Sequence, residues 1–240
     1  MTSIQLETNI RFISETAVTI YVGQEISEEN HEKVKALSTK LENDPFQGLI
    51  EVVPGFYSVT VHFDPLLVMR VKQQGETTSD YIRSFLTDSV KTIDLNKKIP
   101  VREIEIPVVY GGQYGPDLLE VAQFHQLTEE EVINLHSSKS YLVYMLGFAP
   151  GFPYLGGLSS KLTTPRRKKP RLRIKQGSVG IGGEQTGIYP IESPGGWQII
   201  GQTPTSLFSP INHSPCLLQA GDRIRFKPIT EEEFLLLKED

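Results

Sequence analysis

Apolar side chains in the first part of the chain follow strand and helix periods in turn. Residues 17–22 are mostly apolar, and residues 57–63 alternate apolar with polar side chains, which is the period of a half-buried strand. Between these strands the helical spacing of Val34, Leu37 and Leu41 predicts a helix, and Ser27 is its expected N-cap. The turn-forming Asn-Asp-Pro at residues 43–45 is expected to end this helix.

A second helix is predicted to follow Thr78. Its apolar face recurs at helical spacing and comprises Ile82, Phe85, Leu86, Val90 and Ile93. The polar residues 96–98 come next, and we interpret them as a linker. Residues 1–98 are therefore predicted to form a small α+β domain.

Beyond the linker the pattern changes to short strands and turns. A strand is expected near residues 101–108, and most of the 20 glycines and 16 prolines lie in residues 141–240. Capping boxes predict three short helices, and the paired residues are Asp117 with Glu120, Thr128 with Glu131, and Thr230 with Glu233. Short strands separated by glycine turns predict a mainly antiparallel β-barrel or sandwich for residues 99–240.

The composition is that of an ordinary globular protein. The chain is 38% hydrophobic and 22% charged, which excludes disordered, collagen-like and coiled-coil chains. The formal charge is −5, yet residues 166–175 hold seven cations and no acid, so the rest of the chain sums to −5 − 7 = −12. This balance argues against generic nucleic-acid binding.

Cysteine usage and apolar segments indicate a cytoplasmic protein without a membrane partner. Cys216 is the only cysteine, so it cannot form an internal disulfide, which favours a reducing compartment. Residues 1–11 lack the apolar stretch of a secretory signal. Residues 141–158 are apolar but contain two prolines and four glycines, so we expect a buried strand and loop there.

Several signatures of enzymes are missing from the sequence. No glycine precedes a lysine, so there is no Walker-type phosphate loop. The five histidines lie apart, and His31-Glu32 has Lys35 where a zinc-binding helix needs its second histidine, so no metal site is expected. Glycines 180, 182 and 183 lie between strand-like segments, which favours a tight hairpin over a dinucleotide loop.

Residues 147–158 combine aromatic rings with glycine and proline, as a rigid recognition loop does. Proline restricts φ and glycine permits close backbone approach, so Phe148, Phe152 and Tyr154 can form a preorganised binding surface. The alternative is that the rings close one end of the barrel as part of the core. The same two interpretations apply to Trp197, the only tryptophan.

Residues 166–175, which we call the cationic cluster, change their pattern of charged and apolar side chains partway along the segment. From Arg171 onward charged residues alternate with Leu172 and Ile174, which places Arg171, Arg173 and Lys175 on one face of a predicted strand. Such a face is either solvated surface or a binding site for a carboxylate or phosphate. Gln185 and Tyr189 add neutral hydrogen-bonding groups, so a polar pocket with a cationic edge is expected.

These motifs resemble those of one family, the B subunits of the bacterial ATP-dependent 5-oxoprolinase, also called the PxpB/KipI or allophanate hydrolase subunit 1-like family. The resemblance covers the whole chain. The matching segments are residues 106–112, 135–137, 147–156, 164–166, 170–172, 177–182, 185–190 and 194–197.

The resemblance implies a fold, a reaction and partners. The expected fold is an α+β N-terminal domain followed by a cyclophilin-like β-barrel. The expected reaction is the ATP-dependent opening of 5-oxo-L-proline to L-glutamate, with Mg²⁺, a C subunit of the KipA type and an A subunit of the LamB/YcsF type. This chain and the KipA-type partner would phosphorylate the lactam oxygen, and the LamB/YcsF-type partner would complete the hydrolysis. The chain is therefore expected to be inactive alone.

The roles of individual residues follow from this resemblance as hypotheses. Arg166 and Arg171 would neutralise phosphate or carboxylate, together with backbone amides near Gly182 and Gly183. Gln185 and Tyr189 would orient the small substrate. His136 would act as acid or base, or would only bond a backbone carbonyl. These five side chains and two glycines are the candidate site residues.

Two other functions are weighed against the enzymatic one. The family member KipI is described as an inhibitor of the sporulation histidine kinase KinA, countered by KipA. In that role Phe148, Phe152, Tyr154 and Trp197 would line a groove for a helix of the kinase's dimerisation bundle. A cyclophilin-like barrel also suggests prolyl isomerisation, but the arginine-centred constellation of true cyclophilins is not identifiable here.

Overall fold

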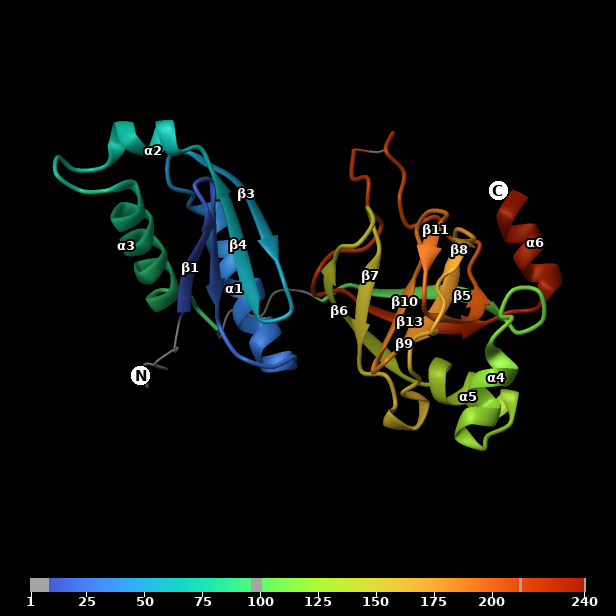
Figure 1. The fold of residues 1–240 in the computed structure, drawn as a ribbon. Helices are drawn as coiled ribbons and strands as arrows, with labels where there is room; N and C mark the ends of the chain where they lie inside the picture. Colours follow the sequence, from blue (N-terminus) through green and yellow to red (C-terminus); the bar gives the residue numbers. More distant parts are fainter. Residues whose placement is uncertain (1–8, 96–100, 212, 240) are drawn as a thin grey trace. The chain divides into compact units, whose positions relative to one another are not determined.

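The computed structural model describes residues 9–95, 101–211 and 213–239, and the chain divides into two compact units, residues 1–100 and 101–240 (Figure 1). The expected boundary lay between residues 98 and 99. The linker expected at residues 96–98 falls outside the described residues.

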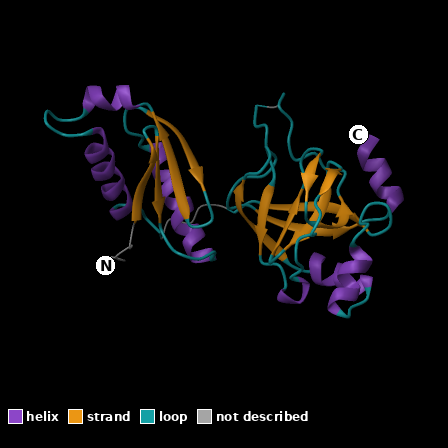
Figure 2. Cartoon of the chain, in the orientation of Figure 1, coloured by secondary structure: helices purple, strands orange, loops and turns teal. Residues whose placement is uncertain are grey.

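The described part of the N-terminal unit combines one antiparallel sheet with three helices (Figure 2). Its elements are β1 (Asn9–Ser14), β2 (Ala17–Tyr21), α1 (Glu28–Asn43), β3 (Leu49–Pro54), β4 (Ser58–Phe63), α2 (Pro65–Val71) and α3 (Thr78–Lys91). The strand order is β1-β2-β4-β3. The buried side chains of β2 and β4 form one core with the apolar stripes of α1 and α3. The two helices therefore cover one face of the sheet.

Helix starts in this unit follow the expected capping chemistry. Ser27 caps α1, with its side chain accepting a hydrogen bond from the backbone N–H of Asn30 at 3.2 Å. Thr77 and Asp80 form a capping box at the start of α3. The sequence interpretation missed α2, although Asp64 followed by Pro65 carries the signal, since proline is favoured in the first helical turn.

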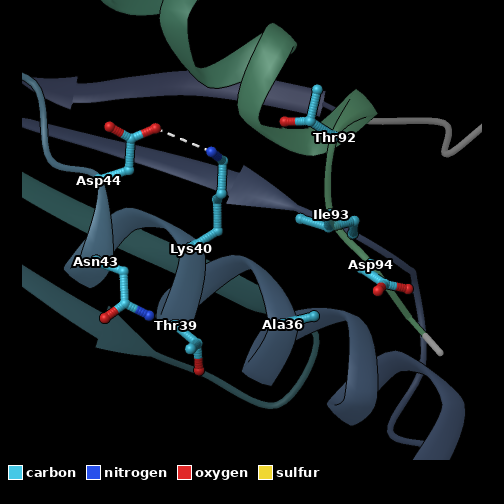
Figure 3. Close-up of a pocket in the computed structure, with 8 residues that line it drawn as sticks. All are labelled: Ala36, Thr39, Lys40, Asn43, Asp44, Thr92, Ile93 and Asp94. Carbon is cyan, nitrogen blue, oxygen red and sulfur yellow. Dashed lines mark hydrogen bonds and ion pairs between the residues drawn. The ribbon is translucent and has the colours of Figure 1, made fainter. Parts of the chain in front are cut away.

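A cavity of about 260 Å³ lies in the N-terminal unit between the second half of α1 and the residues at the end of α3 (Figure 3). An ion pair of 2.9 Å between Lys40 and Asp44 spans its α1 side. None of the residues predicted to form the functional site lines this cavity. The candidate chemistry therefore belongs to the C-terminal unit.

The C-terminal unit is built on a closed barrel. Within the described residues, seven strands close in the order β10-β7-β6-β13-β5-β12-β9. All neighbouring pairs are antiparallel except β13 and β5, which run parallel. The strands are β5 (Glu103–Tyr110), β6 (Ser140–Leu146), β7 (Pro153–Gly156), β9 (Ser178–Gly182), β10 (Gln185–Ile188), β12 (Gln198–Gln202) and β13 (Arg223–Pro228). The prediction of a mainly antiparallel barrel is confirmed, whereas its likeness to cyclophilin stays a prediction.

Short helices and a two-stranded ribbon surround the barrel (Figure 1). They are α4 (Leu118–His125), α5 (Glu129–Ser137), the 3-10 helix η1 (Ser160–Leu162), β8 (Arg171–Ile174), β11 (Ser193–Gly195) and α6 (Glu231–Glu239). The capping boxes at Thr128 and Thr230 are confirmed. Residues 141–158 form β6, a loop and β7, as expected, and no helix in the described part of the chain is long and apolar enough to cross a membrane.

His136 lies inside the barrel core and is fully buried. The Thr186 hydroxyl donates to the Gly180 carbonyl at 3.0 Å, so it accepts from His136 Nε2 at 2.9 Å. His136 Nδ1 then accepts from the Tyr110 hydroxyl at 2.8 Å. Because burial disfavours the charged imidazolium, the pKa of His136 falls to about 3. The ring is therefore a neutral link between α5 and the barrel strands.

This histidine predicts an acid-sensitive barrel. The unfolded chain binds a proton on His136 near pH 6.5 and the folded chain only near pH 3, so stability is lost as pH falls through that interval. Lowering the pH from about 7.5 to about 5 should cost the C-terminal unit about 2 kcal/mol through this residue. Urea unfolding followed by the fluorescence of Trp197 measures it.

The variant His136→Gln keeps a donor and an acceptor but does not titrate, so its stability should depend less on pH in this interval. An NMR titration of the imidazole in the unmodified protein gives an independent reading. An imidazole that titrates near pH 6.5 in the folded chain would contradict the prediction.

Candidate functional site

Five aromatic rings gather on the outer face of the barrel and form what we call the ring cluster, Phe148, Phe152, Tyr154, Tyr189 and Trp197. Phe152 lies at the centre, with its ring centroid 5.1–5.4 Å from those of Phe148, Tyr154, Tyr189 and Trp197. All of these Phe152 contacts are edge-to-face, the arrangement that aromatic quadrupoles favour. The structure thus brings together the four rings predicted for partner binding, with Tyr189 added.

Glycines in the barrel strands make room for these rings. Along β9 and β10, Val179, Ile181 and Ile188 point into the barrel, so the alternate residues face outward. A Cβ on Gly182 would lie 2.5 Å from Nε1 of Trp197, and one on Gly187 would lie 3.0 Å from the same indole. The glycines of this region therefore serve ring packing.

The ring cluster is partly core and partly surface. Phe152 and Tyr189 are each 2% exposed and Trp197 is 5% exposed, because they fill the space between the barrel and the β8–β11 ribbon. Phe148 is 64% exposed, although its ring contacts Phe152 and Tyr189. The core interpretation therefore applies to Phe152 and Trp197, whereas Phe148 is exposed as a binding surface requires. Binding of a partner by these rings stays a prediction.

The backbone at Phe148 is strained. Its φ is +68°, a region that side chains other than glycine rarely adopt. The Ala149 N–H donates to the Gly147 carbonyl at 2.8 Å, which is the hydrogen bond of a γ-turn. A turn of this kind at positive φ costs on the order of 1–3 kcal/mol and persists where the surroundings hold it. The loop backbone at Phe148 therefore forms a defined turn.

Asp117 organises the arginines next to the ring cluster. Its buried carboxylate accepts two hydrogen bonds from Arg171, at 2.6 and 2.8 Å, and one from Arg167 at 2.9 Å. The backbone N–H of Ile199 donates to the same carboxylate at 2.6 Å. We call this group the Asp117 ion-pair cluster. It connects the start of α4 with β8 and β12.

This cluster corrects one expectation from the sequence and refines another. The predicted capping box at Asp117 is wrong, because the carboxylate is engaged by the arginines and caps no backbone N–H of α4. The two cations that were expected to share one strand face differ in their surroundings: Arg171 is partly buried and bound to Asp117, whereas Arg173 is solvated surface and pairs with Glu192. The hydrogen bond to Asp117 raises the pKa of Arg171 further.

Arg166 and Tyr189 lie together at the edge of the ring cluster. The Arg166 guanidinium is exposed and lies 5.9 Å from the centroid of the Trp197 ring, within cation–π range. Burial raises the pKa of the Tyr189 hydroxyl, although a hydrogen bond from the Trp197 backbone and the charges of Arg166 and Arg171 oppose the shift. The predicted grouping of Arg166, Arg171 and Tyr189 is therefore present.

Gly182, Gly183 and Gln185 lie at the turn between β9 and β10. The Gly183 N–H donates to the Thr164 carbonyl at 2.8 Å, so it is not available to a phosphate. Gln185 begins β10 and Tyr189 follows its end, which separates them by roughly 13 Å along the strand. The structure thus does not bring Gln185 and Tyr189 into one pocket. His136 is enclosed in the barrel and lies apart from both.

A cavity of about 530 Å³ lies beside the ring cluster, between α4 and residues 164–169. Its lining residues are Glu120, Val121, Phe124, Thr164, Pro165, Arg166, Arg167, Lys168, Lys169 and Gln198. Of these residues, only Arg166 is a site residue predicted from the sequence. Lys168 and Lys169 belong to the cationic cluster already noted, but Phe124 carried no signal because one exposed aromatic residue on a short helix is common.

Comparison with known proteins places the chain in a family. It matches the family described as carboxyltransferase domain, subdomain C and D, over residues 8–218. The 5-oxoprolinase B subunit of Bacillus subtilis (strain 168) is 44% identical over 236 residues, which cover 96% of this chain and 97% of that protein. That of Haemophilus influenzae is 45% identical, covering 91% and 96%. The chain belongs to the family of 5-oxoprolinase B subunits.

Two solved structures are similar to this chain. A conserved uncharacterized protein from Pyrococcus horikoshii is 42% identical, covers 94% of this chain and all of that one, and has a TM-score of 0.55. The Kluyveromyces lactis urea amidolyase is 22% identical with a TM-score of 0.78, and the match covers 97% of this chain and 15% of that one. The second similarity shows a shared fold.

The Asp117 ion-pair cluster predicts a large loss of stability when its carboxylate is removed. Asp117→Asn should lower the free energy of unfolding of the C-terminal unit by about 2–4 kcal/mol, since it leaves the partly buried Arg171 without a counter-charge and Arg167 with only the exposed Glu120 at 3.4 Å. Urea unfolding followed by Trp197 fluorescence measures the loss. Glu120→Gln is the matched control, because Glu120 is 66% exposed and its loss should cost less than about 1 kcal/mol. Equal losses in the two variants would contradict the prediction.

Proposed function

We propose that this chain is the B subunit of an ATP-dependent 5-oxoprolinase. It would act with a KipA-type subunit and a LamB/YcsF-type subunit to convert 5-oxo-L-proline to L-glutamate. One observation carries the proposal: three curated proteins named as the B subunit of 5-oxoprolinase are 41–45% identical to this chain over more than nine-tenths of its length. The family is one of enzyme subunits, so the partners are part of the proposal.

The reaction explains why ATP is needed. A lactam resists hydrolysis because its amide is stabilised by resonance. Transfer of the γ-phosphoryl group of ATP to the lactam oxygen releases ADP and makes that oxygen a good leaving group. Water then attacks the same carbon, and the C–N bond of the tetrahedral adduct breaks as the nitrogen takes up a proton, which leaves γ-glutamyl phosphate. A second water hydrolyses this acyl phosphate to L-glutamate and inorganic phosphate. This chain and the KipA-type partner would carry out the transfer, and the LamB/YcsF-type partner the hydrolysis.

The residues of this chain would bind and neutralise anions. The exposed guanidinium of Arg166 would meet phosphate or carboxylate oxygens. Tyr189 is only 2% exposed, so its ring would support this point from within the ring cluster and would not itself contact the substrate. Arg171 would act as a positioning residue, because Asp117 holds it in place beside Tyr189. Gln185 and His136 lie away from this point, and we assign them no step.

Mg²⁺ would enter with the nucleotide. Within the described residues no group of three or more His, Cys, Asp or Glu side chains is placed to hold a metal ion. The ATP phosphates and the KipA-type partner would therefore supply the ligands.

The exposed Phe148 supports a second candidate, inhibition of a histidine kinase such as KinA. An aromatic side chain that is 64% exposed, on a backbone turn at positive φ, is a suitable anchor for a partner helix. In this role the C-terminal unit would bind the dimerisation helices of the kinase without consuming ATP. Both roles can reside in one chain, because they use different residues.

Reconstitution tests the enzymatic proposal. The purified KipA-type and LamB/YcsF-type partners are incubated with 5-oxo-L-proline and Mg-ATP, with and without this chain, and L-glutamate is measured. We expect L-glutamate only when all three proteins are present, and none from this chain alone. Glutamate formation at the same rate without this chain would overturn the proposal and leave the kinase as the leading target.

A further inference from the structure

The cavity between α4 and residues 164–169 has the charge of an anion-binding site. Four of its lining residues are cations and one, Glu120, is an acid. Among the described residues Arg166, Lys168 and Lys169 make no ion pair, whereas Arg171 and Arg173 of the same cluster each have a carboxylate partner. Three uncompensated cations on one cavity suit a ligand with several negative charges.

The backbone that carries these cations is held in place before any ligand arrives. Thr164 pairs with Gly183, the Arg167 N–H donates to the Gly196 carbonyl at 2.7 Å, and Gln198 Nε2 donates to the Pro165 carbonyl at 3.1 Å. Arg167 is also bound through Nη1 to Asp117. The cationic segment is therefore preorganised, which lowers the entropic cost of binding.

The opposite wall of the cavity, formed by α4, carries apolar side chains beside the acid Glu120. Val121 and Phe124 of α4 line it, and the Phe124 side chain is 60% exposed at the helix end. An exposed aromatic ring facing a cluster of cations matches a ligand that has a flat ring and a polyphosphate tail. The volume of about 530 Å³ falls in the range of small-molecule sites.

We propose that this cavity binds the nucleoside triphosphate of the reaction. The phosphates would lie against Arg166, Lys168 and Lys169, and the base against Phe124. The inference rests on the proposed function for the identity of the nucleotide, while the site itself rests on the cavity. Two groups expected to bind phosphate are already engaged, because Arg171 donates to Asp117 and the Gly183 N–H donates to the Thr164 carbonyl. The cavity provides other cations that can bind the phosphates.

Binding to the full chain alone is the first test. Equilibrium dialysis measures the dissociation constants of ATP and of inorganic triphosphate, and Trp197 fluorescence reports the same events because Arg166 lies over its ring. The variant Lys168→Ala/Lys169→Ala should raise the dissociation constants of both ligands by roughly tenfold or more, since it removes two charge-assisted contacts to the phosphates. Phe124→Ala should weaken ATP several-fold and leave inorganic triphosphate unchanged.

The matched control removes two exposed cations of the same unit that do not line the cavity, Lys139→Ala/Arg225→Ala. It should bind both ligands as the unmodified chain does. Absence of ATP binding by the unmodified chain, or equal weakening by the control and by the cavity variant, would overturn the site.

The reconstituted enzyme separates this site from the proposed function. If the cavity is the nucleotide site, Lys168→Ala/Lys169→Ala should raise the KM for ATP and leave the KM for 5-oxo-L-proline unchanged. An unchanged KM for ATP in an enzyme that needs this chain would reject the site and retain the function. If the reconstituted reaction proceeds without this chain, the proposed function is rejected, whether or not the chain binds ATP in equilibrium dialysis.

Discussion

The buried carboxylate of Asp117 is the interaction on which the C-terminal unit's outer surface depends. A buried carboxylate is costly unless it is paired and hydrogen-bonded, and Asp117 meets that requirement with two guanidinium groups and the Ile199 N–H. Through these bonds one side chain fixes the start of α4, the first residue of β8 and the cationic segment against β12. The ring cluster and the nearby cavity both lie within this frame.

The same interaction divides the cationic cluster into two functional parts. Arg171 and Arg167 are neutralised and hold the structure together, whereas Arg166, Lys168 and Lys169 remain without a counter-charge among the described residues. A run of cations in a sequence therefore does not mark a uniform anion site. The neutralised arginines position the cations that are available to a ligand.

The barrel supplies rigidity from its interior. The neutral ring of His136 connects Tyr110 of β5 and Thr186 of β10, and stacks on Phe226 of β13 at 4.4 Å. On the outside, Gly182 and Gly187 let the Trp197 and Phe152 rings lie directly on the strands. Side chains at Gly182 and Gly187 would displace these rings, which explains why glycine occupies both strand positions.

Local features were readable from the sequence because their causes lie within a few residues. The caps at Ser27, Thr128 and Thr230, and the change from helical to short-strand spacing, depend on neighbours along the chain. The ring cluster was partly readable, since glycine and proline beside aromatic residues indicate rigid packing. The partners of Asp117, the burial of His136 and the cavity at Phe124 were not readable. They join residues dozens of positions apart, and only the closed barrel brings those residues together, so their charge and burial depend on the fold and not on local sequence.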